Sequence, residues 1–485
     1  MWYNFSMNRI TKGDKLIQKL EDAGYEAYYV GGCVRDLLMD EVRREGTAGT
    51  AAGDIDITTS ATPEEMKRVF QNDSVIETGI QHGTLTVLTE DEAGSGKRIP
   101  IEITTFRTDG TYSDNRHPDS VVFVRSLKED LQRRDFTINA IAMDRNGNIQ
   151  DPFGGMGDIR KRIIRTVGDP DQRFHEDALR IMRAMRFAAV LGSDPDGSFS
   201  IDPATEEAMF RNQELLQNVS AERLFTELKK LITGPFAGIV IRRYVDVLGV
   251  VIPELLPMKG FDQRNPYHKY DILEHCIRAM EVVQPPNEYM KLTALLHDVG
   301  KPDMFYVDEN GIGHMHGHAE RGEVLVRRIM QRLKADRFMT ERVAMLVKYH
   351  DLVFQNDERL LKRWMNRYGA EFLLEILHIK RADNIASGNM SHELSEKYDQ
   401  VEATIHRILE TNACFSVRDL MVNGNDVLAI ANEDSSAENT GGAGKQKGPW
   451  VGEVLDQVLE EVIDGTLPNE REKLLVRIRQ IVSGL

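Results

Sequence analysis

Strand-forming segments are confined to the first third of this chain, and that division constrains its fold more than any other feature. Short runs rich in valine, isoleucine and threonine, which favour β-strands, occur at residues 27–32, 55–59, 84–89, 100–106 and 137–144. Helical patterns separate them near residues 11–23, 33–40 and 62–71. From about residue 170 onward amphipathic helical patterns dominate, as at 173–191, 220–233 and 268–283. The sequence therefore predicts the α+β class, with a mixed α/β head followed by a mostly helical body.

At 485 residues the chain is too long for a single hydrophobic core, so several domains are expected. We predict a head at residues 1–168 and then three helical domains, at 169–240, 241–395 and 396–485. Residues 433–448 are poor in apolar side chains, so this segment is expected to be a disordered insertion in the last domain.

The bulk composition excludes several classes of protein. No segment approaches the roughly eighteen uninterrupted apolar residues of a membrane span, and the N-terminus lacks the pattern of a signal peptide. Cys33, Cys276 and Cys414 have no CxxC spacing, so a reducing cytoplasm is expected rather than a disulfide framework or a zinc ribbon. The formal charge of −16 argues against broad, sequence-blind nucleic-acid binding but leaves room for a local basic track. The sequence does not determine the oligomeric state.

A glycine pair and an acidic pair lie close together near the N-terminus. Gly31 and Gly32 separate an apolar strand from a predicted helix that carries Arg35, and such a turn offers backbone N–H groups to a phosphate. Asp54 and Asp56 lie two residues apart on the next predicted strand, so their carboxylates point to the same face. Two such carboxylates suit Mg²⁺ beside a triphosphate. Each pattern is weak alone, but together they indicate a nucleotidyl-transfer site.

An arginine pair precedes the last predicted strand of the head. Arg133 and Arg134 could clamp phosphate oxygens with their forked donors, and Asn139 could hydrogen-bond a sugar or hold a turn. An Arg-Arg pair alone is more typical of a solvated surface. The acidic pair in the same head favours the phosphate interpretation.

A periodic group of charged residues follows in the predicted helix at 173–191. Asp177, Arg180, Arg183 and Arg186 recur every three residues, which predicts a stripe along one helix face. An aspartate and an arginine on adjacent turns can hydrogen-bond the edge of a nucleobase, while the further arginines bind phosphates. Taken alone, an ordinary helix with Asp–Arg pairs is at least as good an interpretation.

Five motifs occur here in the order seen in class II tRNA nucleotidyltransferases, and the chain resembles this family of CCA-adding enzymes. The motifs are Gly-Gly-x-Val-Arg-Asp, Asp-x-Asp, Arg-Arg-Asp-Phe-Thr-Ile-Asn-Ala, Asp-Pro-Phe-Gly-Gly and Glu-Asp-x-x-Arg-x-x-Arg-x-x-Arg-Phe. The match covers about residues 25–235, and the family shares its head with bacterial poly(A) polymerases. The resemblance implies a nucleotidyltransferase head that uses CTP, ATP and Mg²⁺ to add CCA to the 3′ end of tRNA with release of pyrophosphate.

The resemblance also implies a role for each matching residue. Asp54 and Asp56 would be the catalytic residues and would hold Mg²⁺. The nucleotide-binding residues would be Gly31, Gly32, Arg35, Arg134, Asp177, Arg180, Arg183 and Arg186. Among these, Asp177 and Arg180 would pair with the Watson–Crick edge of CTP or ATP, and the others would contact the triphosphate and sugar. The helical body and tail would support the tRNA by shape and backbone contacts.

Two loops bear on this resemblance. The segment at 41–53 is longer and richer in glycine and alanine than the usual connection in the family, which could alter access for tRNA. Residues 109–119 resemble the family's flexible loop, which is associated with the switch from C to A addition. The second loop favours complete CCA addition over partial CC addition.

A second constellation lies in the predicted domain at 241–395. His275, the pair His297-Asp298, and Asp383 resemble the four metal ligands of HD-type phosphohydrolases. Imidazole and carboxylate ligands without a thiolate suit a divalent transition metal or Mg²⁺. Such a metal could generate hydroxide for phosphoester hydrolysis, for example at 2′,3′-cyclic or 2′-phosphates of RNA ends. A degenerate HD fold that only packs against tRNA is the alternative.

Three more residues accompany these ligands. His318 and His350, the latter followed by Asp351, lie where such domains can place a second metal or a phosphate contact. His314 and His316 are better assigned to a loop.

Two rival functions belong to different classes. A poly(A) polymerase or A-adding enzyme would share the head, but such polymerases often carry a basic tail, whereas this tail is acidic on balance. A non-catalytic RNA-binding or HD-signalling protein with a relic head would have no reason to keep Asp54, Asp56, Arg35 and Arg134 together.

Overall fold

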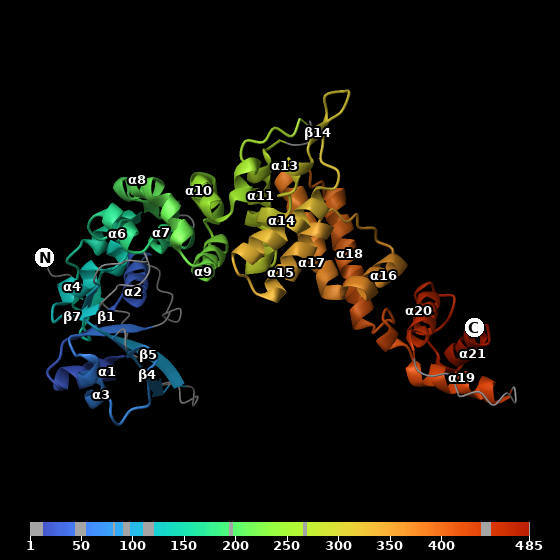
Figure 1. The fold of residues 1–485 in the computed structure, drawn as a ribbon, viewed down its shortest axis with the longest axis horizontal. Helices are drawn as coiled ribbons and strands as arrows, with labels where there is room; N and C mark the ends of the chain where they lie inside the picture. Colours follow the sequence, from blue (N-terminus) through green and yellow to red (C-terminus); the bar gives the residue numbers. More distant parts are fainter. Residues whose placement is uncertain are drawn as a thin grey trace. The chain divides into compact units, whose positions relative to one another are not determined.

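The computed structural model describes residues 13–43, 55–80, 83–90, 98–109, 121–193, 197–264, 269–437 and 448–484. The chain forms two compact units. The first comprises Met1–Leu256 with Gln331–Ala335, and the second comprises Pro257–Met330 with Asp336–Leu485. Figure 1 shows the large sheet in the blue, N-terminal part and mainly helices in the second unit, as the α+β prediction requires. The four predicted domains are a finer division and stay a prediction.

A seven-stranded sheet forms the head, with strand order β3-β4-β5-β2-β1-β8-β9. Its strands are β1 (Ala27–Val30), β2 (Asp56–Thr59), β3 (Val75–Ile76), β4 (Thr84–Glu90), β5 (Arg98–Thr105), β8 (Ala142–Met143) and β9 (Ile149–Gln150). Strand β2 pairs with β5 in parallel and with β1 in antiparallel orientation, so the sheet is mixed. The strands predicted at 27–32, 55–59, 84–89 and 100–106 are confirmed.

The strand predicted at 137–144 is wrong over most of its length. Thr137–Asn139 form a 3₁₀ helix, η2, and only Ala142–Met143 join the sheet. The reason is tertiary, because the buried Thr137 hydroxyl donates to Asp158 Oδ2 at 2.7 Å and the Thr137 N–H donates to the Arg165 carbonyl at 2.9 Å. Partners distant in sequence thus outweigh the local strand propensity of the segment.

Helices cover the sheet as the apolar pattern predicts. They are α1 (Asp14–Asp22), α2 (Gly32–Arg43), α3 (Pro63–Val69), α4 (Leu127–Gln132) and α5 (Gly155–Lys161), with a two-stranded ribbon of β6 (Arg107–Asp109) and β7 (Val121–Phe123). Helix α3 begins with a capping box, in which Thr62 accepts from the Glu65 N–H and Glu65 accepts from the Thr62 N–H. The glycine- and alanine-rich segment before β2 and the loop resembling the family's flexible loop lie almost wholly outside the described residues.

The helix predicted at 173–191 is two helices. Helix α6 (Pro170–Glu176) ends at Asp177, whose backbone is extended at φ −146° and ψ 102°, and α7 (Leu179–Val190) begins two residues later. The Asp177 carboxylate accepts the Leu179 N–H at 3.1 Å, a local bond by which a short acidic side chain competes with a continuous helix. The predicted single stripe is therefore wrong at its first member, because Asp177 lies at the break before α7.

The remainder of the first unit is helical. It contains η3 (Gln213–Asn218), η4 (Pro253–Met258), α8 (Pro203–Asn212), α9 (Ala221–Ile232), α10 (Ala237–Val251) and the short strands β10 (Ile163–Ile164), β11 (Gly192–Ser193), β12 (Gly197–Ser198) and β13 (Ser200–Ile201). The helix predicted at 220–233 is confirmed as α9, whose Leu224, Leu228 and Leu231 are buried at helical spacing.

The second unit is built from helices around an apolar core. These are α11 (Ile272–Val282), α12 (Glu288–Leu296), α13 (Lys301–Met304), α14 (His318–Arg332), α15 (Arg337–Tyr349), α16 (Glu358–Tyr368), α17 (Ala370–Ser387) and α18 (His392–Glu410), with a hairpin of β14 (Tyr306–Val307) and β15 (Gly313–His314). The last helices, α19 (Gly424–Ala437), α20 (Pro449–Ile463) and α21 (Arg471–Val482), follow η5 (Val417–Asp419) and share a separate apolar cluster.

The structure tests two expectations about the helical body. Residues 433–437 belong to α19, so the predicted disorder is wrong there, and residues 438–447 lie outside the described residues. Among the described residues, no helix is long and apolar enough to cross a membrane.

Candidate active site and metal centre

A cavity of about 590 Å³ in the first unit gathers most of the residues that the sequence analysis assigned to nucleotide binding. The predicted residues that line it are Gly31, Gly32, Arg35, Asp56, Arg134, Arg183 and Arg186. Further lining residues include Asp36, Asp135, Asn139, Phe187, Lys230 and Thr233. Asp54 lies outside the described residues, and Asp177 and Arg180 are not among the lining residues.

Strand pairing places a second carboxylate, Glu102, next to the lining residue Asp56. Asp56 opens β2 and is the register partner of Glu102 on the parallel strand β5, so the two side chains project from the same face of the sheet. The neighbours Ile101 and Ile103 are fully buried on the other face. Sequence analysis missed Glu102, although the alternation Ile-Glu-Ile in a strand is the signal of a single carboxylate on the open face.

Gly31 brings the acidic and basic sides together. Its φ of +79° belongs to the left-handed region, which glycine adopts without the steric cost of a side chain. A Cβ at this position would lie 3.2 Å from Arg134 Nη1 and 3.8 Å from Asp56 Oδ2. The bare turn before α2 thus allows a guanidinium and a carboxylate to approach the same backbone.

A chain of hydrogen bonds fixes the basic side. Arg35 Nη1 donates to Asn139 Oδ1 at 2.8 Å, and Asn139 Nδ2 donates to Asp135 Oδ1 at 3.1 Å. Asp135 also accepts from Arg183 Nε at 2.8 Å. Burial alone would raise the pKa of Asp135, but the Arg183 guanidinium and Asn139 hold that pKa well below its ordinary value. The network therefore keeps a buried carboxylate ionised between two arginines of the cavity.

Three arginine side chains pack over the ring of Phe187. The guanidinium carbons of Arg35, Arg183 and Arg186 lie 5.2, 5.4 and 4.1 Å from the centre of its ring. Such contacts favour a cation over the ring face. Arg186 is also paired with Glu227, with Nε and Oε2 3.1 Å apart. The cavity thus has a preorganised cationic wall suited to phosphate oxygens.

The two residues assigned to base recognition are engaged within the protein. Arg223 Nη2 donates to Asp177 Oδ2 at 2.7 Å. The buried Arg180 donates from Nη1 to the Arg173 carbonyl at 2.9 Å and to Glu176 Oε2 at 2.7 Å, and from Nη2 to the Arg133 carbonyl at 2.9 Å. The two members of the arginine pair have different surroundings. Arg134 lines the cavity, whereas Arg133 Nη2 donates to Asp130 Oδ1 at 2.8 Å.

A second cluster lies in the second unit and contains the four predicted HD ligands. His275 comes from α11, His297 and Asp298 follow α12, and Asp383 comes from α17. His275 Nε2 lies 3.1 Å from His297 Nε2, 3.0 Å from Asp383 Oδ1 and 3.6 Å from Asp298 Oδ2. Ligand atoms that share one ion at about 2.1 Å lie roughly 3–4 Å from one another, so these residues fit a metal.

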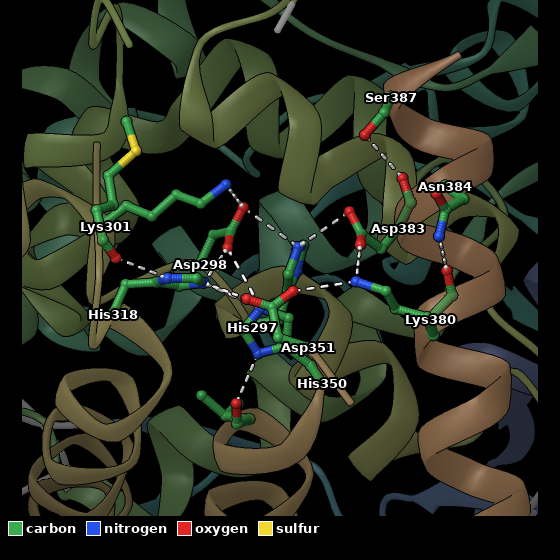
Figure 2. Close-up of polar contacts among 12 residues, drawn as sticks. His297, Asp298, Lys301, His318, His350, Asp351, Lys380, Asp383, Asn384 and Ser387 are labelled. Carbon is green, nitrogen blue, oxygen red and sulfur yellow. Dashed lines mark hydrogen bonds and ion pairs between the residues drawn. The ribbon is translucent and has the colours of Figure 1, made fainter. Parts of the chain in front are cut away.

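Three additional residues adjoin this cluster. Figure 2 shows His318, His350 and Asp351 beside Asp298, with Lys380 reaching both Asp351 and Asp383. Lys301 also contacts the cluster, with its Nζ 2.6 Å from Asp298 Oδ2. A cavity of about 410 Å³ opens onto these groups.

The buried charges of the cluster stabilise one another. Burial alone would raise the pKa of Asp298, but His297 and Lys301 hold it well below its ordinary value. Burial lowers the pKa of His297, which favours the neutral imidazole that a metal requires. For His350, burial opposes the charged form but is outweighed by Asp298 and Asp351, which raise its pKa.

Models of three protein domains match the chain. The poly(A) polymerase head domain matches residues 27–165, a probable RNA and SrmB-binding site of polymerase A matches 198–257, and domain 2 of tRNA nucleotidyltransferase matches 318–478. The first match contains the strands that carry Asp56 and Glu102. This match lies within the segment that the sequence analysis predicts to be the head.

Individual proteins extend the match to nearly the whole chain. The CCA-adding enzyme of Geobacillus stearothermophilus is 34% identical over 470 residues, which cover 95% of this chain and 94% of that enzyme. The one from Geobacillus thermodenitrificans is 51% identical over 223 residues, or 46% of this chain and 49% of that enzyme. A solved CCA-adding enzyme in complex with ATP is 20% identical with a TM-score of 0.52 over 97% of this chain and 93% of its own, a likeness of fold alone.

A closer solved relative supports both fold and sequence. The crystal structure of the Bacillus stearothermophilus CCA-adding enzyme in complex with CTP has a TM-score of 0.67 and 30% identity, covering 98% of this chain and 97% of its own. The agreement spans the head and the helical body. This chain therefore belongs to the CCA-adding enzymes, the nucleotidyltransferases that complete the CCA sequence at the 3′ end of tRNA.

Proposed function

We propose that the cavity of the first unit is the nucleotidyl-transfer site, where CTP or ATP binds with its phosphates against the arginines and its α-phosphate near the acidic strand pair. The observation that carries this proposal is the convergence of Asp56 with Arg35, Arg134 and Arg183 on one cavity. The two sides meet at the Gly31 turn, where neither a carboxylate nor a guanidinium is kept away by a side chain.

The acidic side fits Mg²⁺. Carboxylate oxygens are the ligands that Mg²⁺ prefers, and Asp56 would hold the ion with Glu102 and with Asp54. Bound there, Mg²⁺ would favour deprotonation of the tRNA 3′-hydroxyl and stabilise the leaving pyrophosphate. The protein's own contribution is to fix these carboxylates by strand register and to orient the triphosphate with preformed arginines.

Base recognition by Asp177 and Arg180 is the second element of this proposal. Both side chains carry the donor and acceptor atoms that a nucleobase edge requires, but each is bonded inside the protein. In this proposal a base replaces Arg223 at Asp177 and Glu176 at Arg180. Recognition would then be an exchange of hydrogen bonds rather than a gain of new ones.

The test is extension of a tRNA transcript that lacks CCA, with products resolved at single-nucleotide length. Asp56→Ala should abolish addition while tRNA binding persists, and Asp73→Ala, which removes a partly exposed acid of the same head, should leave addition intact. Normal turnover in Asp56→Ala would refute the metal assignment. The wild-type product should grow by C, C and A and then stop, whereas a ladder of A would identify a poly(A) polymerase.

A second activity is favoured by the buried cluster of the second unit. We infer that His275, His297, Asp298 and Asp383 hold one divalent transition metal ion and that the site hydrolyses phosphoesters. In such a reaction a water oxygen bonds to phosphorus, the ester P–O bond breaks, and the proton moves to the leaving oxygen. The mutual ligand distances and the absence of a thiolate among these four residues support this assignment.

Release of phosphate or ring opening at RNA with 2′-phosphate or 2′,3′-cyclic phosphate ends would test the second activity. It should require added metal and be lost in His297→Ala/Asp298→Ala, while His314→Ala, in the nearby hairpin, should retain it. No metal-dependent reaction in the wild-type protein would overturn this activity without affecting CCA addition. A cytoplasmic location, expected from the cysteine pattern, stays a prediction.

A further inference from the structure

We infer that Asp130 is a positioning residue for nucleotide addition, because it fixes the Arg134 guanidinium relative to the strand that carries Asp56. This inference rests on the nucleotidyl-transfer site proposed above, in which Arg134 contacts the nucleotide. Asp130 lies in α4, its side chain is fully buried, and it is not among the residues that line the cavity. Its effect on the reaction therefore passes through Arg134 and not through contact with CTP or ATP.

The two oxygens of the Asp130 carboxylate have different partners. Oδ1 accepts from Arg133 Nε at 3.0 Å, from Arg133 Nη2 at 2.8 Å and from the Arg107 N–H at 3.3 Å. Oδ2 accepts from the Thr58 hydroxyl at 3.1 Å and lies 3.6 Å from Arg134 Nη2. The bonds at Oδ1 hold the carboxylate in place, while Oδ2 joins a strand of the sheet to an arginine of the cavity.

The Thr58 hydroxyl connects this carboxylate to the acidic strand. Thr58 and Asp56 lie two residues apart on β2, so their side chains project from the same face of the sheet. Thr58 is itself fixed, because it is the register partner of Thr104 and its hydroxyl lies 3.2 Å from the Thr104 carbonyl oxygen. The position of Asp130, and with it that of Arg134, is therefore set relative to Asp56.

Arg134 has few other contacts that could orient it. Within the part of the chain that the structure describes, its only ion pair is with Asp130, and its buried Nε has no hydrogen-bond partner. On the side of the cavity, Arg134 Nη1 would lie 3.2 Å from a Cβ on Gly31. At 3.6 Å the contact with Asp130 is an ion pair and not a hydrogen bond, so the N–H groups of Arg134 remain available to phosphate oxygens.

The charge of Asp130 can be removed with little change of shape. Burial alone would raise the pKa of Asp130, but the Arg133 and Arg134 guanidiniums hold that pKa below its ordinary value, so the carboxylate is ionised at neutral pH. Asp130→Asn keeps a hydrogen-bond acceptor for Thr58 but loses the attraction for Arg134. This substitution therefore separates the positioning of the guanidinium from the packing of α4 against the sheet.

The test is steady-state addition of the first C to a tRNA transcript that lacks CCA, with KM measured for CTP and for tRNA. Asp130→Asn in the full chain should raise the KM for CTP about tenfold and leave the KM for tRNA unchanged, because Arg134 faces the nucleotide. All variants are compared at a temperature where circular dichroism reports the folded state.

Two further variants distinguish positioning from a purely structural role. In the Arg134→Ala background, Asp130→Asn should change the KM for CTP by less than about twofold, since the residue through which it acts is already gone. Glu375→Gln is the matched control, because Glu375 is a buried carboxylate of the second unit whose Oε2 lies 2.6 Å from Arg342 Nε. Glu375→Gln should lower the free energy of unfolding and keep both KM values.

Thr58→Val keeps the ion pairs of Asp130 and removes only the hydroxyl, so it decides the question if Asp130→Asn does not fold. It should raise the KM for CTP about threefold, and only when Arg134 is present. A raised KM in Arg134→Ala but in neither other variant would overturn this inference and leave the proposed site standing. Equal effects of Asp130→Asn with and without Arg134 would also overturn it. An unchanged KM in Arg134→Ala would overturn both this inference and the assignment of Arg134 to the site.

Discussion

At the scale of single residues, Arg180, which we propose to recognise the base, is held by hydrogen bonds within the protein. Its guanidinium spans the carbonyls of residues 173 and 133 and the Glu176 carboxylate, so the side chain is already oriented before any nucleotide arrives. A base that cannot replace Glu176 leaves the existing bonds in place. Selection would therefore depend on how well the incoming edge competes with a carboxylate.

Arg180→Ala should blur discrimination of CTP and ATP from UTP and GTP. Base-edge pairs carry about 1–3 kcal/mol of discrimination, so the ratios of kcat/KM should fall by roughly five- to 150-fold. Steady-state kinetics with all four nucleotides will measure this. Arg211→Ala, which removes an exposed guanidinium of the same unit, is the matched control. Unchanged selectivity in Arg180→Ala would assign base reading elsewhere.

Asp135 contributes a pH-dependent part of the stability of the first unit. Because its folded-state pKa is depressed, its stabilisation is present above the unfolded pKa of about 3.9 and is lost as pH falls toward the folded value. Asp135→Asn should cost about 3–5 kcal/mol in the free energy of unfolding at pH 7, since it removes the carboxylate that bonds Arg183 and leaves only Glu227, 3.7 Å from Arg183 Nη1, to balance this guanidinium.

Urea unfolding at several pH values will check this expectation. The difference between wild type and Asp135→Asn should shrink as pH falls from 5 to 3. Asp73→Asn, which removes a partly exposed carboxylate paired with Lys19, should cost less than about 1 kcal/mol. A difference that stays constant across this pH range would contradict the proposed role of the Asp135 charge.

At the scale of elements, the turn between β1 and α2 allows the conformational cost of a substitution to be measured separately from its effect on nucleotide addition. Gly31→Ala places a side chain at φ +79°, which costs about 1–2 kcal/mol, and a Cβ 3.2 Å from Arg134 Nη1. Gly24→Ala at φ +88° should bear the same conformational cost with no atom within 4 Å of the new Cβ. Thermal unfolding should shift similarly in both, but only Gly31→Ala should lose nucleotide addition. Equal nucleotide addition by Gly31→Ala and Gly24→Ala would disprove a role for the close approach of Arg134 to Gly31.

The elements that sequence predicted well are those with a local cause. Helix α3 has its cap and proline, and α9 its apolar spacing, so both could be placed without the fold. The failures have causes that the apolar pattern does not reveal. The turn of η2 depends on Asp158 and Arg165, which are distant in sequence, and at Asp177 a local side-chain bond accompanies the break before α7.

The candidate sites follow the same rule. Motif residues such as Arg35 and Asp56 could be assigned from sequence, because their types and spacing match the chemistry. Glu102 and Phe187 could not, since a carboxylate and an aromatic ring acquire their roles only from the strand register and from the arginines that pack around them. The order His275, His297-Asp298, Asp383 predicted that these four residues lie together, but only the structure shows which oxygen of Asp298 faces which histidines.

At the scale of the whole molecule, each compact unit carries its own candidate site. CTP should therefore raise the unfolding transition of the first unit, and Mn²⁺ that of the second. At a hundredfold excess over Kd, either ligand should add about 2.7 kcal/mol to the unit that binds it. Differential scanning calorimetry of wild type, Asp56→Ala and His297→Ala will assign the transitions. Mn²⁺ stabilisation that survives His297→Ala would place its main site outside the cluster.

The parallel pairing of β2 with β5 has a consequence for how proteins of this kind can diversify. Asp56 precedes Ile57, whose register partner Ile103 is also buried in the core, so the pairing of β2 with β5 fixes the position of Asp56. Insertions or deletions in the chain before β2 are therefore expected to leave Asp56 in place. The position of the acidic group therefore depends on the strand register, so the preceding segment can change to suit different RNA surfaces.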